Sequence, residues 1–475
     1  MSRYKMFAAL PFLAVSFSGF FAAAASAQQQ MPPEMAAAAS TQIEPVLSES
    51  PEKPLEQPLA AAAAEAAPAA QPAAAPAEAA ASAPGIAAVE WDFLKLNGEN
   101  KDEDVLEALL PQVAAWLRTY PDNEAADEAL LLKANLHLKL GDHRAAILDL
   151  GKLLQEYPGS KASPAALQLL SITADKKLSK REKALLLEIA KASKGGGKAD
   201  RLAAFLGEMA ARFGQEFYAP LTAEFNDFFE RFPGYAGRDA LELTLGTLYS
   251  QKKEFVQARL AYEKLIHIYP DSALIARAKR LLGDVLAEDL KEYFAAIKVY
   301  RDITERFPGT DEAWAAYAQL PRLTERQKQY TLAVEVYENI IKLYPEKPEA
   351  RSAYKSEARV LREEMSKPAE AIAVLNRLAD KYKDESAVEE LYLAAEIARK
   401  DSKDLETEVK MYDRIAADYA GGKEAPKALL AAGQAFEKIK NTDKAREYYE
   451  KIVKDYPEDP LAKKAQKYID ALLKS

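Results

Sequence analysis

An aromatic residue followed by proline recurs along this 475-residue chain at a nearly constant interval. The intervals between successive markers are 37, 75, 37, 38, 37, 38, 37 and 37 residues, and the interval of 75 contains Gly195-Gly196-Gly197 where one marker is missing. A period of about 20 to 50 residues is typical of stacked repeats. The markers, two of which lack the proline, are Tyr120-Pro121, Tyr157-Pro158, Phe232-Pro233, Tyr269-Pro270, Phe307-Pro308, Tyr344-Pro345, Tyr382, Tyr419 and Tyr456-Pro457.

The residues before each marker predict a helix that ends there. Positions four and seven before the marker are apolar or aromatic in all nine cases, and offsets of 4, 7 and 11 share one helical face. A second helical stretch precedes this one, as in 239–250, 274–288 and 425–440. The unit is therefore a helix–turn–helix, and stacking such pairs buries a continuous core. The position eleven before the marker is alanine in six cases, which are Ala146, Ala258, Ala296, Ala333, Ala371 and Ala445.

Three segments resemble the tetratricopeptide repeat (TPR) in pattern and spacing. The resemblance implies an all-α fold, a right-handed superhelical α-solenoid of about nine to ten helix–turn–helix repeats over 91–475, in which a small residue of the first helix packs against the alanine of the second helix. Tyr269-Pro270-Asp271-Ser272 is similar to repeats of bacterial envelope proteins, namely the lipoprotein of the outer-membrane barrel assembly machine and the periplasmic coordinator of cell division. The segments contain Leu245-Gly246, Tyr249, Phe255, Ala258, Tyr262 and Pro270; Leu282-Gly283, Ala296, Tyr300 and Pro308; and Gly433, Phe436, Ala445, Tyr449 and Pro457.

The chain departs from that pattern in four ways. Residues 160–230 are degenerate, Pro321 replaces the small residue of one first helix, and Glu408 replaces the alanine of one second helix. The chain also has no cysteine, so the lipid-carrying cysteine of the similar lipoprotein is missing and we predict no direct lipid anchor. Residues 459–473 are expected to form a helix that caps the last repeat.

The N-terminus has the order of a secretory signal peptide. Arg3 and Lys5 precede the apolar run 7–21, and Ala25-Ser26-Ala27 supplies the small residues of a cleavage site, so we expect residues 1–27 to direct export. An uncleaved membrane anchor remains the alternative. Residues 28–90 are rich in Ala, Pro, Gln, Glu and Ser, which predicts a disordered linker. Eight Glu against one Lys give this tract a charge of -7 out of the chain's total of -9.

The sequence contains no recognisable catalytic or metal-binding constellation. His137 and His143 are six residues apart, whereas two ligands on one helix face would be four apart, and we interpret them as surface or turn residues. Gly195-Gly196-Gly197-Lys198 is followed by Ala199 where a phosphate loop needs Ser or Thr. We therefore predict no enzyme activity, no cofactor and no metal, and the acidic charge argues against nucleic acid as a partner.

The TPR resemblance implies that the first helices line a groove that holds a peptide or a partner's surface. We predict an exported, non-enzymatic scaffold of the Gram-negative periplasm that serves outer-membrane biogenesis or the cell-envelope and division machinery, associated with the outer membrane only through partners. The alternative is a helical accessory subunit of a polysaccharide-export or peptidoglycan-remodelling enzyme complex. The oligomeric state stays open. The groove positions fall on Thr247, Gln251, Arg277, Arg280, Asp284, Lys427, Gln434 and Lys438.

Overall fold

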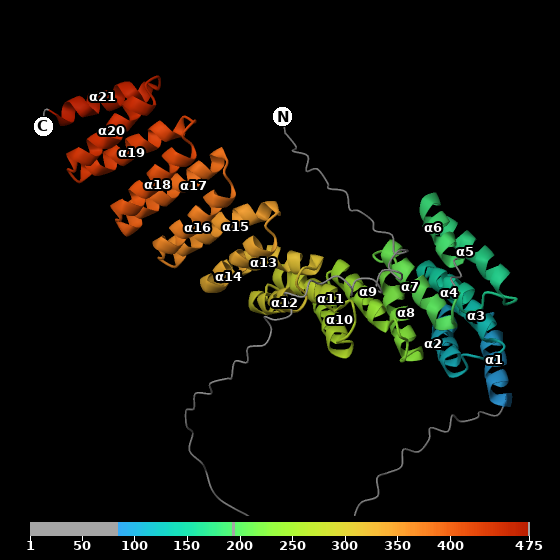
Figure 1. The fold of residues 1–475 in the computed structure, drawn as a ribbon. Coiled ribbons are helices and arrows are strands. Elements are labelled where there is room, and N and C mark those ends of the chain that lie inside the picture. Colours follow the sequence, from blue (N-terminus) through green and yellow to red (C-terminus); the bar gives the residue numbers. More distant parts are fainter. Residues whose placement is uncertain (1–83, 192–194, 474–475) are drawn as a thin grey trace, which may run out of the picture. The chain divides into compact units, whose positions relative to one another are not determined.

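A computed structural model describes residues 84–191 and 195–473 (Figure 1). The predictions for residues 1–27 and for 28–83 lie outside these ranges. The described residues form helices and turns without a strand, and none of their helices is long and apolar enough to cross a membrane. The α-helices are α1 (Pro84–Gly98), α2 (Glu103–Thr119), α3 (Ala126–Lys139), α4 (His143–Glu156), α5 (Ser163–Lys177), α6 (Lys180–Lys191), α7 (Lys198–Phe213), α8 (Tyr218–Arg231), α9 (Arg238–Gln251), α10 (Phe255–Ile268), α11 (Ile275–Asp284), α12 (Tyr293–Arg306), α13 (Asp311–Arg326), α14 (Tyr330–Leu343), α15 (Pro348–Arg359), α16 (Pro368–Lys381), α17 (Glu385–Ile397), α18 (Leu405–Asp418), α19 (Glu424–Lys438), α20 (Thr442–Asp455) and α21 (Pro460–Leu472).

The helices form consecutive pairs, in which the odd-numbered member is the first helix and the even-numbered member the second. Each helix packs against the next one along the chain (Figure 1), and α21 packs against α20 after the tenth pair. The predicted all-α solenoid of helical repeats is confirmed. Three first helices continue into a π-helical turn, at Val285–Asp289, Val360–Glu364 and Ala398–Ser402. Two of these turns lie in the 38-residue repeats, where a π turn accommodates the extra residue.

The aromatic markers are the residues at which the second helices end. The backbone N–H of each described marker donates to the carbonyl four residues earlier, as Tyr269 does to Leu265 and Tyr382 does to Leu378. Tyr382 and Tyr419 make this bond although no proline follows them. The proline prevents the helix from continuing but is not needed to end it.

The small residue of the first helix lies closest to a tyrosine of the second helix, and not to the expected alanine, in three pairs. A Cβ atom added to Gly246 would lie 2.5 Å from the Tyr262 ring, and one added to Gly283 would lie 2.6 Å from the Tyr300 ring. Gly433 faces Tyr449 in the same way, at 2.4 Å. Even alanine would therefore displace the ring, and this is the physical reason for the small residue in the repeat pattern.

The two substituted repeat positions are accommodated without breaking the array. Helix α13 runs through Pro321 without a break, and Tyr317 and Leu320 beside that residue are buried. Glu408 is buried, and its Oε1 accepts a hydrogen bond of 3.2 Å from the Tyr412 hydroxyl. Burial raises the pKa of this carboxyl group above its ordinary value.

The degenerate segment 160–230 contains two helix pairs, α5–α6 and α7–α8, and α5 and α6 contact each other less than the helices of the other pairs do. Helix α4 packs against α5, as in the other repeats, and it also packs against α7, although α5 and α6 lie between α4 and α7 in sequence. A Cβ atom on Gly151 of α4 would lie 2.2 Å from the Phe205 ring of α7, which shows how closely these two helices approach. Helix α4 therefore contacts the first helices of both pairs that follow it, α5 and α7.

The structure differs from the sequence prediction at the boundary of the repeats. Helix α1 begins at Pro84, within the tract 28–90 that we expected to be a linker, so repeat structure starts before residue 91. Trp91 and Leu94 of α1 are buried, and the indole N–H of Trp116 donates to the Ala87 carbonyl at 3.2 Å. Through these contacts α2 holds the first turn of α1 in place. At the other end, Asp459 caps α21, which lies within the predicted capping helix 459–473.

A left-handed residue recurs in the turn between the first and second helix of a pair. Six non-glycine residues there have φ between 53° and 66°, and five of them are lysines. Lysine in this region costs about 1 kcal/mol because its Cβ approaches the following carbonyl oxygen. The six residues are Lys253, Lys291, Lys328, Ser366, Lys403 and Lys440.

Replacing Lys328 by glycine is expected to stabilise the array by about 0.5–1 kcal/mol. Glycine adopts the native φ of 56° without the Cβ contact, and this gain exceeds the entropy that glycine adds to the unfolded chain. The midpoint of urea unfolding measures the change. The matched control is Lys298→Gly on the exposed side of α12, which should lower the midpoint because glycine disfavours a helix interior. A lower midpoint for Lys328→Gly would contradict the prediction.

Candidate functional site

The predicted groove residues lie on three first helices and form two separate groups. Thr247 and Gln251 are on α9, and Arg277, Arg280 and Asp284 are on the neighbouring α11. Lys427, Gln434 and Lys438 are on α19, four helix pairs farther along the chain than α11. The structure therefore brings Thr247, Arg277, Arg280 and Asp284 together and leaves the three residues of α19 at a distant position of the array.

The first group meets around a buried tyrosine. The hydroxyl of Tyr262 lies beside Thr247, and Arg280, Asp284 and Arg277 are close enough to act on it electrostatically. Burial is the main reason that the pKa of Tyr262 is raised above its ordinary value. The neutral hydroxyl is hydrogen-bonded with Thr247 inside the helix pair.

Several predicted groove residues are engaged within the chain. Arg280 Nη1 lies 2.5 Å from Asp284 Oδ2, and the Tyr300 hydroxyl donates to Asp284 Oδ1 at 2.7 Å. Lys427 forms an ion pair of 2.8 Å with Glu424. A ligand that used these side chains would have to compete with internal partners. Their role in binding stays a prediction.

Ion pairs that join successive first helices were missed by the sequence reasoning. Arg359 Nη2 lies 2.6 Å from Glu325 Oε2, and Arg362 Nε lies 2.6 Å from Asp401 Oδ2. Arg322 pairs with Glu288 in the same manner. We call these three pairs the first-helix ladder. Two of the pairs span 34 residues in sequence, close to the repeat length, and this spacing was the only signal that could have revealed them.

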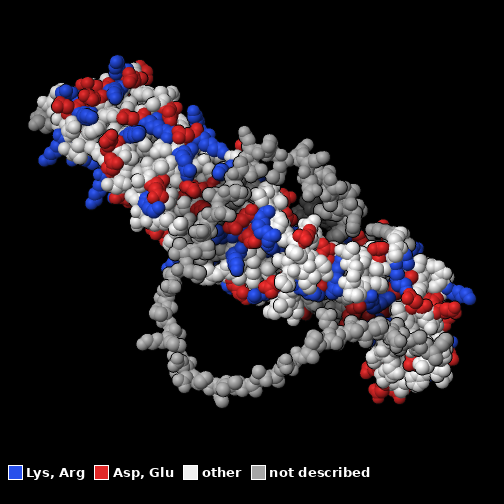
Figure 2. All heavy atoms as spheres, turned by 60° about the horizontal axis from the view of Figure 1, so that its bottom comes forward, with Lys and Arg blue, Asp and Glu red and all other residues white. Residues whose placement is uncertain are grey.

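The ladder gives the first-helix side a mixed charge. Figure 2 shows Lys and Arg interspersed with Asp and Glu along most of the described surface that it displays. Exposed ion pairs contribute about 0–1 kcal/mol each to stability, so their main consequence concerns selectivity. A partner must present both signs of charge in register to replace these contacts, and a partner of one sign would leave half of the groups unpaired.

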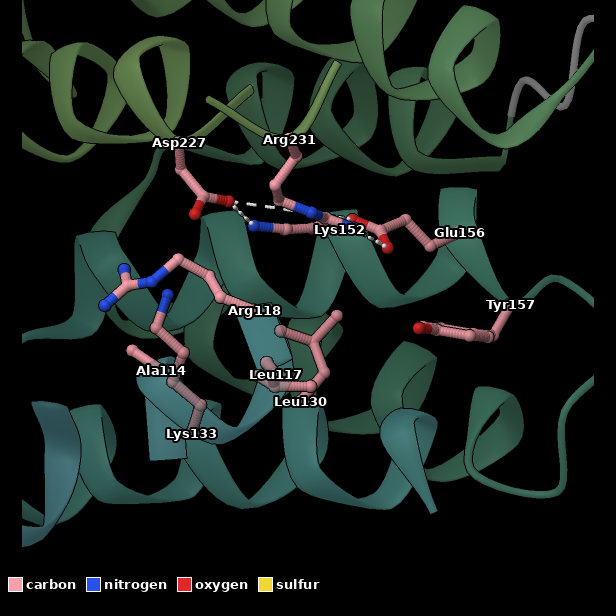
Figure 3. Close-up of a pocket in the computed structure, with 10 residues that line it drawn as sticks. All are labelled: Ala114, Leu117, Arg118, Leu130, Lys133, Lys152, Glu156, Tyr157, Asp227 and Arg231. Atoms are coloured by element: carbon pink, nitrogen blue, oxygen red, sulfur yellow. Dashed lines mark hydrogen bonds and ion pairs between the residues drawn. The ribbon is translucent and has the colours of Figure 1, made fainter. Parts of the chain in front are cut away.

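A buried ion network connects α3, α4 and α8 (Figure 3). Lys152 Nζ lies 2.6 Å from Glu224 Oε2 and 2.8 Å from Asp227 Oδ2. Lys133 Nζ lies 2.7 Å from Asp149 Oδ1 and 3.2 Å from Glu224 Oε1. These partners are up to 91 residues apart in sequence, so the network attaches α8 to helices that precede the pair α5–α6.

A bidentate pair completes the network. The two Nη atoms of Arg231 each donate to one carboxylate oxygen of Glu156 at 2.8 Å. A cavity of about 30 Å³ adjoins these side chains, and it is lined by Ala114, Leu117, Arg118, Leu130, Lys133, Lys152, Glu156, Tyr157, Asp227 and Arg231. This volume corresponds to about one water molecule and excludes an organic ligand. The network is therefore a polar part of the core.

Opposite charges keep the network ionised. Burial alone would raise the pKa of Glu224, but the positive charges of Lys152 and Lys133 outweigh it and hold that pKa well below its ordinary value. Burial alone would lower the pKa of Lys133, yet Asp149 and Glu224 raise it above its ordinary value. Each charge compensates the desolvation of its neighbours, and removing one member leaves another buried without a partner.

One histidine lies elsewhere than predicted. His137 is not a surface residue, because its Nδ1 lies 2.7 Å from Asp149 Oδ2 and 13% of its side chain is exposed. His143 lies at the start of α4, and burial together with Lys177 and Lys176 lowers its pKa. Within residues 84–191 and 195–473, no group of three or more His, Cys, Asp or Glu side chains is arranged to hold a metal ion.

A groove on the second-helix side was not predicted. It has a volume of about 740 Å³ and runs between α12 and α14. Phe294 is exposed at its edge, and its charged residues balance, with three cations and three carboxylates. The residues that line it are Phe294, Ile297, Lys298, Arg301, Asp302, Glu305, Lys328, Gln329, Tyr330, Thr331, Leu332 and Glu335.

Four segments of the chain match the family model of the tetratricopeptide repeat. They are residues 128–160, 239–272, 313–347 and 427–459. Each match covers most of one helix pair, namely α3–α4, α9–α10, α13–α14 and α19–α20. The chain therefore contains tetratricopeptide repeats, which are typically non-catalytic scaffolds for protein–protein interaction.

Several solved structures are similar to this chain at low identity. They include Naa15/Naa10 bound to HypK-THB (14% identity, 82% of this chain and 61% of that chain, TM-score 0.33), the TPR domain of P58(IPK) (16%, 74% and 99%, TM-score 0.22) and the apo form of RapI (11%, 78% and 97%, TM-score 0.31). This chain thus aligns with less than two thirds of the first of these. No curated protein matches the sequence. Likenesses this weak carry no argument about function.

Proposed function

We propose that this protein is an exported, non-enzymatic scaffold of the Gram-negative periplasm that binds envelope proteins or their peptide segments. It would serve outer-membrane biogenesis or the cell-envelope and division machinery, and would reach the outer membrane only through its partners. The observation that carries the binding role is the row of first helices joined by the ladder Glu288–Arg322, Glu325–Arg359 and Arg362–Asp401. Successive helices there offer both signs of charge at one-repeat intervals.

Export is supported by the N-terminal sequence. Two basic residues, the apolar run 7–21 and Ala25-Ser26-Ala27 follow one another in the order that a secretion signal requires. A location in the cell envelope is also supported by the motif Tyr269-Pro270-Asp271-Ser272, which is similar to a motif of known envelope repeat proteins. The groove residues around Tyr262 are the part of the first-helix side at which we expect a partner to bind.

Crosslinking in intact cells tests this function. A photoreactive amino acid at Gln251 or Arg277 should capture the same envelope protein, and the same group at Lys342 on α14 should not, because Lys342 is exposed on a second helix. Cell fractionation should recover the chain from the periplasm. Localisation in the cytosol would contradict the export proposal, and equal capture from Lys342 would contradict binding on the first-helix side.

The same experiment separates the alternative function. An accessory subunit of polysaccharide-export or peptidoglycan-remodelling machinery would be captured with a glycan-processing enzyme, and its deletion would change the length of the glycan product. A barrel-assembly or division scaffold would leave that length unchanged.

A further inference from the structure

Helix α1 has two apolar faces, and only one of them is covered. Ala87, Trp91 and Leu94 are buried against the rest of the array. Four large apolar residues on the other side are exposed, namely Ile86 (51%), Val89 (70%), Phe93 (53%) and Leu96 (77%). Their spacing of 3, 4 and 3 residues places them on one face in the pattern of a coiled-coil seam. We call this set the α1 seam.

The position of α1 in the array explains why a seam there needs a partner. Later first helices are packed against the helix that precedes them, whereas no described helix precedes α1. End repeats of a solenoid normally have a polar outer face. The other end follows this rule, because Lys463, Lys464, Gln466 and Lys467 are exposed on α21. The N-terminal end does not, and its apolar face lies where the helix of a preceding repeat would pack.

The residues just upstream of α1 lack the side chains to cover this seam. Residues 60–83 contain no Val, Ile, Leu, Met, Phe, Tyr or Trp, and five prolines lie within 54–76. A matching helix requires about three to four large apolar residues at positions a and d. Residues 60–83 therefore cannot supply the covering helix.

The charges around the seam indicate the charge of the chain that binds it. On the helical wheel Glu90 lies on one side of the seam and Asp92 on the other, and both are exposed. Lys95 is the one cation of α1, and its Nζ lies over the Trp91 ring at 5.7 Å, away from the seam. Residues 84–128 hold eleven Asp and Glu against three Lys and Arg, whereas residues 129–475 hold 55 against 58. The end of the array around α1 is thus acidic.

We propose that the α1 seam binds an amphipathic helix of a partner protein, with apolar residues at 3–4–3 spacing and Lys or Arg beside them. Such a helix takes the place of a preceding second helix, covers the four apolar side chains, and pairs with Glu90 and Asp92. A second copy of this chain would bring carboxylates against carboxylates along both sides of the seam, which disfavours self-association. The seam lies at the N-terminal end of the array, away from the groove residues around Tyr262 and from the ladder. Binding of a helix to the seam does not depend on the compartment in which the protein resides.

Designed peptides test the chemistry without knowledge of the natural partner. The probe is a labelled helical peptide of about 18 residues with Leu at positions a and d and Lys at e and g. Its two controls carry Glu at e and g, or Ser at a and d. Fluorescence anisotropy with the purified full chain should give a Kd of about micromolar for the Lys peptide, and binding at least about tenfold weaker for each control.

Variants of the chain locate the binding site. Phe93→Ser with Leu96→Ser should weaken binding of the Lys peptide by about tenfold or more, because two apolar contacts are lost. The matched control is Val256→Ser with Leu260→Ser, two exposed apolar residues of α10, which should leave binding unchanged. Glu90→Lys with Asp92→Lys should reverse the preference toward the Glu peptide. Since all six residues are exposed, thermal unfolding should be the same for all variants.

Three results would overturn the proposal. The first is equal binding of the Lys and Glu peptides to the unaltered chain. The second is binding that survives Phe93→Ser with Leu96→Ser. The third is a dimer in sedimentation that this double variant dissociates, since a second copy would then occupy the seam. Loss of the periplasmic localisation or of first-helix crosslinks would leave the peptide results unaffected, so this proposal and the proposed function fail separately.

Discussion

Replacing Lys152 by methionine is expected to lower the free energy of unfolding by about 3–5 kcal/mol. Methionine keeps much of the volume but leaves Glu224 and Asp227 without the ammonium group that lies 2.6 and 2.8 Å from them. Removing one partner from a buried ion pair is costly because the remaining charge stays desolvated. The loss should appear as earlier urea unfolding and as faster amide exchange in α4 and α8, whose attachment depends on this network.

Two further variants distinguish an electrostatic cause from a packing cause. Lys152→Met combined with Glu224→Gln should recover part of the lost stability, because the stranded charge is neutralised. Lys298→Met on the exposed side of α12 makes the same chemical change without a buried partner and should shift stability by less than about 0.5 kcal/mol. If the double variant were no more stable than Lys152→Met alone, the loss would come from packing and the electrostatic explanation would be wrong.

A neutral side chain at position 357 is expected to stabilise the protein above pH 7. The Glu357 side chain is 1% exposed, and its Oε2 is buried without a hydrogen-bond partner among the described residues. Oε1 accepts a hydrogen bond of 2.8 Å from Arg377, but burial dominates and raises the pKa of Glu357 from 4.5 to about 7. Glutamine keeps the shape and an acceptor for Arg377 and removes the buried charge.

The pKa shift determines how stability varies with pH. Between pH 4.5 and 7 the folded protein holds a proton on Glu357 that the unfolded chain has released, so stability falls as the pH rises through this window. Glu357→Gln should remove that decline and gain about 2–3 kcal/mol above pH 7, with no gain below pH 4.5. Urea unfolding over this pH range measures it. Glu349→Gln, an exposed carboxylate on the same helix, should keep the original pH dependence. Parallel curves for Glu357→Gln and the unaltered chain would contradict the assignment.

The regular part of the fold could be predicted because its causes lie within one repeat. Residues four and seven before Tyr269 face one side of a single helix, and Gly246 and Tyr262 are 16 residues apart within one pair. The apolar positions recur before all nine markers and the glycine–tyrosine pair recurs in three repeats, so each repeat supports the interpretation of the others. The same locality explains why the helix ends at Tyr382 and Tyr419 follow the lattice although the proline is absent.

The candidate site could be predicted only in part. Thr247, Arg277 and Asp284 occupy first-helix positions of adjacent pairs, and the structure places them around Tyr262. The internal partners of Arg280 and Asp284 were not predicted, because Tyr300 reaches Asp284 from the second helix of the pair. The ladder from Glu288 to Asp401 was also missed, since each pair joins two repeats and the repeat pattern describes only what is the same within each one.

The sequence by itself determined that the chain forms stacked helix pairs, because the 37-residue lattice specifies an apolar face and a helix end within each unit. Tertiary structure alone decided that α4 contacts α7 as well as α5, since the chain carries no marker between Tyr157 and Phe232. It also brought Lys133 within 3.2 Å of Glu224 across 91 residues and left the α1 seam uncovered. Packing selects these contacts from many charged and apolar residues, and that selection depends on distances between helices that no local pattern encodes.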